Sequence, residues 1–135
     1  MFEITQIAAR DTFTLELKNG NGDVLLDASG APLSVTVYGP GSKAFRQAQA
    51  ERNQRMIDRM AKAGKTRLSA EENQRETALF LAACTVSFNG WCYQGKNDAH
   101  AIEAAYLDPA IGFIADQVGA AIPDWANFTS SSPQS

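Results

Sequence analysis

The pattern of apolar residues in this chain changes once, at the Gly-Pro-Gly triplet of residues 39–41. Before the triplet, apolar and polar residues alternate, as at Phe13, Leu15 and Leu17, which is the period of a half-buried strand. After it, residues 43–63 contain no Gly or Pro and consist mainly of good helix formers. Because Gly and Pro interrupt regular structure, the sequence predicts a β region followed by a helical region.

The β region is expected to span about residues 12–38. Two segments rich in Gly, Asn, Ser and Pro, at residues 19–22 and 28–32, predict turns within it. The stretches that remain are expected to be strands, at about residues 12–17, 24–26 and 33–38. Together they predict a three-stranded antiparallel meander with one apolar face, which needs a helical layer to cover it.

The helical region, expected at about residues 42–122, begins with two long helices. Ser42 is a natural N-cap for the first helix. Ser69 and Glu72 fit a capping box at the start of the second. Because residues 79–88 are apolar almost all round, the second helix is expected to run through them as the central core helix.

Two shorter helices are expected next. Asn97 or Asp98 can cap a third helix, which runs to Leu107. Asp108 and Pro109 then start a fourth helix with a cap and a proline at its first position. The apolar stripe of this fourth helix consists of Ile111, Ile114, Ala115, Val118 and Ile122.

The expected fold class is therefore α+β, with an N-terminal antiparallel β-meander followed by about four helices, in a single domain of residues 1–128. Residues 129–135 are expected to be a flexible polar tail. No apolar run approaches the ~20 residues of a membrane-spanning helix, and residues 1–5 lack the features of a signal peptide. We therefore expect a cytoplasmic location, in which Cys84 and Cys92 are reduced thiols.

Positive charge gathers in one part of the chain. Residues 43–67 hold eight of the 12 Lys and Arg residues and only two acidic residues, a net charge of +6. Residues 1–42 carry −3 and residues 68–135 carry −6. This segregation suits a head-to-tail contact between copies of the chain, in which opposite charges meet.

The first predicted helix carries a candidate protein-interaction surface. On a helical wheel, Phe45, Met56, Met60 and Ala63 form a narrow apolar stripe, and basic side chains border it on one side. Arg is common at the edge of protein interfaces, where its stem packs and its charged head pairs. The predicted interaction residues are Arg46, Arg52, Arg55, Met56, Arg59, Met60 and Lys62.

Nucleic acid is the alternative partner for the basic helix 43–67, because Lys and Arg neutralise phosphates. A solvated helix face without any partner is the third interpretation. The net charge of −3, the pI near 5.1 and the lack of aromatic residues among the cations favour a protein partner over nucleic acid. We expect no membrane partner.

The sequence indicates no catalytic or metal centre. His100 and Glu103 share one helical face, but the chain has no second His to complete a metal site. Cys84 falls on the predicted core helix, where a thiol acts as a small apolar group. The carboxylates from Glu71 to Glu76 occupy the first turns of a helix, where the macrodipole favours negative charge. We therefore predict a non-enzymatic protein without metal or cofactor.

Four motifs follow one another along the chain. A strand leads through Gly-Pro-Gly-Ser into the basic helix at residues 33–46, and an acidic-capped helix ends in Phe-Asn-Gly-Trp at residues 88–91. An Asp-Pro helix lies at residues 107–118, and an Asn-Phe pair at residues 127–128 precedes the polar tail. This order of motifs, over about residues 24–128, resembles the tail assembly chaperones of long-tailed (siphovirus-type) bacteriophages and prophages.

The resemblance implies a non-enzymatic role in viral morphogenesis. Such chaperones coat the tape measure protein, keep its long apolar helices soluble and help to recruit tail tube subunits. A minor, longer product of programmed ribosomal frameshifting often contacts the tail tube protein. The resemblance also implies self-association into a curved or spiral multimer in the host cell cytoplasm, and absence from the mature virion. It assigns no catalytic residues.

Overall fold

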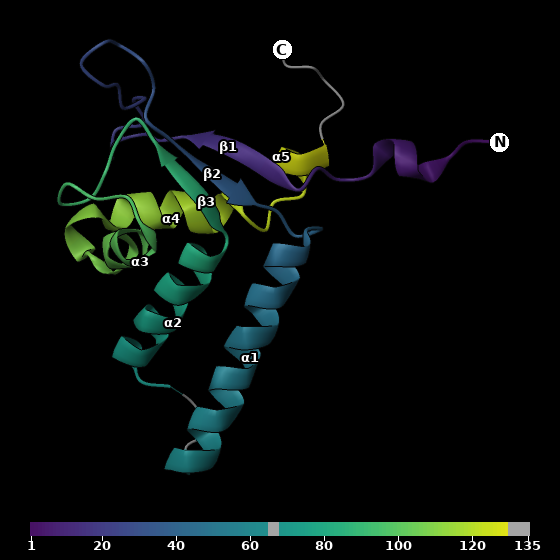
Figure 1. Ribbon diagram of the computed structural model, residues 1–135, viewed down its shortest axis with the longest axis vertical. Coiled ribbons are helices and arrows are strands. Elements are labelled where there is room, and N and C mark those ends of the chain that lie inside the picture. The colour runs from purple at the N-terminus through teal and green to yellow at the C-terminus, as the bar shows by residue number, and fades with distance from the viewer. Residues whose placement is uncertain (65–67, 130–135) are drawn as a thin grey trace.

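The computed structural model describes residues 1–64 and 68–129, apart from the side chain of Ala63. It confirms the α+β class, with a three-stranded antiparallel sheet and a group of helices (Figure 1). The strands are β1 (Thr12–Glu16), β2 (Ser34–Tyr38) and β3 (Thr85–Asn89). The helices are α1 (Lys43–Ala63), α2 (Ala70–Ala83), α3 (Ala99–Leu107), α4 (Gly112–Ala121) and α5 (Ala126–Thr129). Two 3-10 turns are η1 (Ile4–Ile7) and η2 (Pro109–Ile111).

Some sequence predictions fall outside the described residues. Lys65 and Arg67, two of the eight clustered cations, lie there, and so do residues 130–135 of the expected tail. Thr129 is described and ends α5. The helical structure therefore extends one residue into the segment that was expected to be a tail.

Residues 24–26 do not form the expected strand. Among the described residues they make isolated bridges, from Lys18 to Val24 and from Leu26 to Pro32, inside the loop that joins β1 to β2. β1 pairs directly with β2 along its whole length instead. Because Pro32 has no N–H group, it cannot donate the hydrogen bond that would extend the Leu26 bridge into a ladder.

The third strand is β3, which comes from the segment expected to continue the central core helix. β3 pairs antiparallel with β2, and Phe88 lies opposite Val35. The prediction of a helix through residue 88 is therefore wrong beyond Ala83, where α2 ends. An apolar run of this length suits a buried strand as well as a helix, and β-branched and aromatic residues favour the strand.

The caps expected for the first three helices are confirmed, but the one expected for the fourth is not: Asp108 caps the 3-10 turn η2, and α4 begins at Gly112 without a side-chain cap. The Ser42 side chain caps α1, and Ser69 and Glu72 form the reciprocal bonds of a capping box at the start of α2. Of the two candidates for α3, Asp98 is the cap. Short polar side chains of this kind satisfy backbone N–H groups that have no partner within the helix, so they fix where each helix begins.

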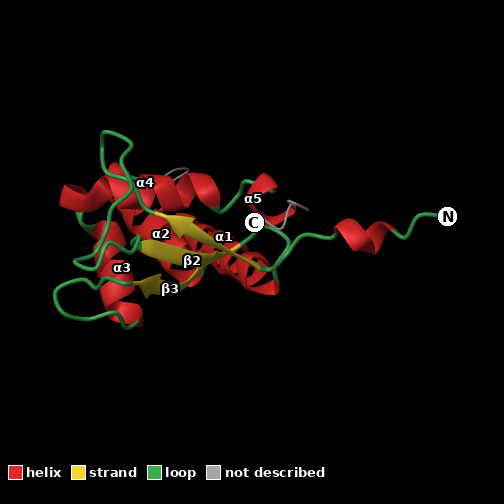
Figure 2. Cartoon of the chain, turned by 90° about the horizontal axis from the view of Figure 1, so that it is seen from above, coloured by secondary structure: helices red, strands yellow, loops and turns green. Residues whose placement is uncertain are grey.

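The core lies between the sheet and the helices α2, α3 and α4, which lie along one face of the sheet (Figures 1 and 2). Val35 and Val37 of β2 are fully buried in one cluster with Leu81 of α2. Val118 and Ile122, from the stripe predicted for the fourth helix, complete the cluster without any exposure. α1 packs on α2 and runs away from the sheet beside it (Figure 1).

Phe128 of α5 closes one end of the core. Its fully buried ring meets Phe13 of β1 edge to face, with ring centroids 5.8 Å apart. Its carbonyl oxygen accepts a hydrogen bond from the Arg10 N–H at 2.8 Å. Gly39 lies directly against the ring, and a methyl group at this position would overlap ring carbons. Gly39 therefore permits a close approach in addition to interrupting the strand.

We predict that Gly39→Ala destabilises the protein by about 1–3 kcal/mol, the usual cost of overpacking a well-filled core. Gly20→Ala is the control, because a methyl group there meets no atom within 4 Å. Urea unfolding followed by circular dichroism measures both. In a protein that already carries Phe128→Ala, Gly39→Ala and Gly20→Ala should have the same small effect on stability, because the ring that the methyl group would overlap is absent. A Gly39→Ala protein as stable as Gly20→Ala would contradict the close approach.

Candidate protein-interaction site

The seven predicted interaction residues all lie on α1, which forms an antiparallel hairpin with α2. Near the start of α1, Phe45 meets Phe80 of α2 edge to face, with ring centroids 5.5 Å apart. Toward the end of α1, Arg59 faces Glu72 near the start of α2, with Nε and Oε2 4.0 Å apart. Figure 1 shows this hairpin projecting from the body of the molecule.

A buried carboxylate lies between the two helices. The Glu76 side chain has no exposed surface. Arg55 Nε donates to both of its oxygens, at 2.9 and 3.2 Å, and Arg59 Nη2 lies 3.2 Å from Oε2. Charge-assisted hydrogen bonds are the condition under which a carboxylate can be buried without a prohibitive loss of hydration. Glu76 is therefore the partner of two of the predicted interaction residues.

The structure brings three predicted arginines together along the seam between α1 and α2. Besides Arg55 and Arg59, the guanidinium carbon of Arg52 lies 5.3 Å from the centroid of the Phe80 ring, in cation–π geometry. These cations face the neighbouring helix of their own chain. Their charge is thus partly neutralised before any partner binds.

The other four predicted residues differ in their exposure. Arg46 and Lys62 are exposed, and Met56 and Met60 are half-buried. Ile57, which the sequence did not single out, is 60% exposed. Because residues three and four apart are neighbours on a helix, Met56, Ile57 and Met60 form one continuous apolar area. We call these three residues the α1 flank.

Sequence reasoning missed Glu76 and Ile57. The signal for Glu76 was its spacing: Glu72, Glu76 and Phe80 recur every four residues and so share one face of α2. Two carboxylates on the same side of a core helix as an aromatic residue predict cations on the helix that packs against that side. Ile57 had a weaker signal, because it lies next to Met56 but outside the narrow stripe on the helical wheel.

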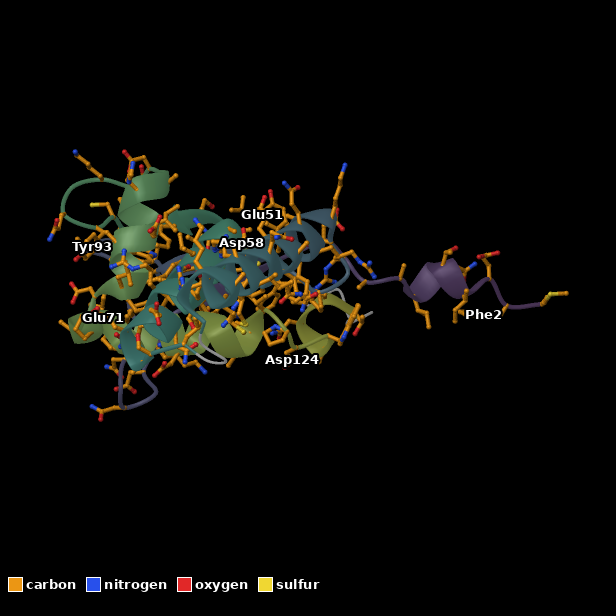
Figure 3. All side chains as sticks on the ribbon, turned by 90° about the horizontal axis from the view of Figure 1, so that it is seen from below. Phe2, Glu51, Asp58, Glu71, Tyr93 and Asp124 are labelled. Atoms are coloured by element: carbon orange, nitrogen blue, oxygen red, sulfur yellow. The ribbon has the colours of Figure 1, made fainter. Side chains whose placement is uncertain are left out.

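A cavity of about 430 Å³ opens beside the seam. Its described lining consists of Arg55, Asp58, Arg59 and Lys62. Figure 3 shows Asp58 on the same side of α1 as Glu51. Of the described lining residues, three are cationic and one is acidic, so the cavity favours an acidic group of a partner.

Other candidate chemistry is dispersed. His100 is exposed and Glu103 is half-buried, and no group of three potential metal ligands was found among the described residues. Cys84 is buried and Cys92 is exposed, and both are free thiols. Within the same described ranges, no helix is long and apolar enough to cross a membrane.

No protein-family model, curated protein or solved structure matches this chain. We therefore infer a function from the α1–α2 hairpin.

We predict that Glu76→Gln lowers the free energy of unfolding by about 3 kcal/mol. This is the lower end for a broken buried ion pair, because the two arginines keep about a third of their side chains in water. Glu71→Gln, an exposed neighbour on the same helix, should change stability by less than about 0.5 kcal/mol. Denaturant unfolding of both variants provides the measurement. Equal stability of the two variants would show that Glu76 does not hold α1 against α2.

We predict that the two thiols differ sharply in reactivity. Burial raises the pKa of Cys84 to about 12 from its ordinary 9.0, so the reactive thiolate is scarce in the folded protein. At about pH 8, an aromatic disulfide reagent should modify Cys92 at once and Cys84 only after unfolding. Cys92→Ser should abolish the fast phase. Two equally fast thiols would show that Cys84 is not held in the core.

The raised pKa also fixes the direction of the pH dependence. Because the folded value lies above the unfolded one, the contribution of Cys84 to stability is complete below about pH 9 and is lost as the pH rises toward 12. Burial acts in the same direction on Tyr106, whose pKa rises to about 12. Alkaline unfolding should therefore begin before either group titrates in the folded state.

Proposed function

We propose that this protein is a tail assembly chaperone of a long-tailed phage or prophage, which binds the tape measure protein without catalysing a reaction. The observation that carries the proposal is the projecting α1–α2 hairpin, whose α1 flank leaves Ile57 60% exposed beside the half-buried Met56 and Met60. The resemblance of the sequence to this family supplies the identity of the partner.

The shape of the α1 flank suits a helical partner. A helix that lies along α1 would bury Ile57 and the free sides of Met56 and Met60, in the manner of helices that bind through anchors at i, i+3 or i+4 spacing. Methionine side chains are unbranched and polarisable, so they adapt to partners of varied sequence. A tape measure protein presents long apolar helices of varied sequence, which is the kind of surface that such a flank can cover.

The polar surroundings add a second point of contact. The cavity lined by Arg55, Arg59 and Lys62 offers positive charge to an acidic group of the partner. A carboxylate on the partner helix would form a charge-assisted hydrogen bond there. Arg46 and Lys62 are exposed and can pair with further acidic groups at the rim.

The pairing of Arg55 and Arg59 with Glu76 favours a protein partner over nucleic acid. A guanidinium group that already neutralises a carboxylate releases fewer counterions when it meets a phosphate. The wider role follows the resemblance: recruitment of the tail tube protein, mainly through a frameshifted longer product, in the host cytoplasm and outside the mature virion.

The test is co-expression of this chain with a tape measure protein, followed by measurement of the soluble tape measure fraction after centrifugation. Met56→Ser with Ile57→Ser and Met60→Ser should weaken binding about tenfold or more, because apolar anchors dominate such contacts. Val86→Ser is the matched control, since Val86 is a 43% exposed apolar residue on β3, away from the hairpin. It should solubilise the partner as well as the original protein does.

Two results would remove the proposal. One is a tape measure protein that is equally soluble without this chain. The other is full protection by the triple variant. Fluorescence anisotropy with a short DNA duplex at about 50 mM salt tests the alternative, because binding through phosphates is strongest at low salt. Tight, salt-sensitive binding in that assay would favour nucleic acid.

A further inference from the structure

The chain contains three Asn-Gly dipeptides, at residues 19–20, 21–22 and 89–90. An Asn side chain that precedes Gly is chemically labile in water, because the backbone nitrogen of the next residue can attack the side-chain amide and Gly has no Cβ to obstruct the approach. The structure restrains the three Asn side chains to different degrees, so their reactivities should differ.

Asn89, at the end of β3, is the most restrained of the three. Its Nδ2 donates to the hydroxyl groups of Ser34 and Thr36, at 3.1 and 3.0 Å. Its Oδ1 accepts from the Ser87 hydroxyl at 2.8 Å. These bonds tie the side chain to the neighbouring strand β2, and any rotation of the amide group toward the next backbone nitrogen would break them.

Asn19 is restrained by a tight turn in the loop that joins β1 to β2. Its Oδ1 accepts from the backbone N–H groups of Asn21 and Asp23, at 2.9 and 3.1 Å. Its own N–H donates to the Asp23 carbonyl at 2.8 Å. Asn side chains that bond the backbone two residues on are typical of turns, and here both bonds keep the amide group in one orientation.

A second turn of the same kind follows in the same loop. The Asp27 Oδ1 accepts from the Ser29 N–H at 2.8 Å, and the Asp27 carbonyl accepts from the Gly30 N–H at 3.0 Å. Gly22 and Gly30 also have nearly the same φ angle, 87° and 88°. Ser29 therefore occupies the position that Asn21 has in the first turn, so this position accommodates a Ser.

The side chain of Asn21 is unrestrained. It is exposed, and it makes no hydrogen bond with any other part of the chain that the structure describes. Only the bond from the Gly22 N–H to the Asn19 carbonyl, at 3.0 Å, has to open before the Gly22 nitrogen can react. The space around Gly22 is open as well, since a Cβ at this position would meet no atom within 4 Å.

We infer that Asn21 is a site of spontaneous deamidation in the folded protein. The Gly22 nitrogen gives up its proton and bonds to the side-chain amide carbon of Asn21. The amide nitrogen takes up a proton and leaves as ammonia, so a cyclic succinimide remains. Water then opens the ring at one of its two carbonyl carbons, which yields aspartate or isoaspartate. The only other reactant is water.

The modification changes the charge and the backbone of the loop. Each conversion adds one negative charge to a chain whose net charge is −3. Isoaspartate also places an additional methylene group in the main chain, which alters the spacing of the N–H and C=O groups that close the turn. In Figure 1 this loop lies at the end of the molecule opposite the N-terminus. The modification stands apart from the proposed function, because it leaves the α1 flank unchanged.

The test follows the conversion of each Asn over time by proteolytic digestion and fragmentation mass spectrometry of the full chain, incubated at mildly alkaline pH. In the folded protein, Asn21 should convert about tenfold faster or more than Asn19 and Asn89, since two or more side-chain hydrogen bonds restrain each of those residues. In guanidinium chloride, where these bonds are absent, the three should convert at similar rates.

Asn21→Ser is the control variant, because Ser29 shows that a Ser fits this position of the turn. It should lack the fast conversion and should melt at the same temperature as the original protein, as followed by circular dichroism. The inference is overturned if Asn21 converts no faster than Asn19 and Asn89 in the folded protein. It is also overturned if the ratio of the three rates is the same in the folded and the unfolded protein, because the structure would then protect none of them.

Discussion

The Glu76 carboxylate fixes how α1 sits on the rest of the molecule. It is buried between two helices and is bonded to Arg55 and Arg59, which lie one helical turn apart. Burying an ion pair adds little net stability, but losing one partner is costly. A slide of α1 by one turn would leave this carboxylate without one of its arginines, so the interaction sets the register of the hairpin. That register therefore fixes where the α1 flank lies along the hairpin.

Much of the fold could be predicted because its boundaries are set by local chemistry. Ser42, Ser69 and Asp98 satisfy helix N–H groups from neighbouring positions in the chain, so their role is visible in the sequence. The third strand could not be predicted in the same way. Residues 85–89 are apolar enough for either a helix or a buried strand, and only the free edge of β2, distant in sequence, decides between them.

The sequence predicted that the candidate residues share one helix, but not how their side chains are oriented. A helical wheel gives the angles between residues of one helix, but it does not say which side meets a neighbour. Arg55 and Arg59 bordered the apolar stripe as expected, yet they face α2 because Glu76 lies opposite. Comparing the sequences of both helices would pair these cations with Glu72 and Glu76, which lie four residues apart on α2. The exposure of Ile57 depends on the same packing and could be seen only once the helices were placed.

The pairing of β2 with β3 has a consequence for the order in which this chain folds. Val37 pairs with Thr85, and all of α1 and α2 lies between them in the sequence. The loop that must close is long, but a preformed hairpin brings its ends together and shortens the effective search. During synthesis, one edge of β2 therefore stays unpaired until both helices, and β3 after them, have left the ribosome. The hairpin that we propose as the partner-binding element thus also brings the last strand of the sheet into place.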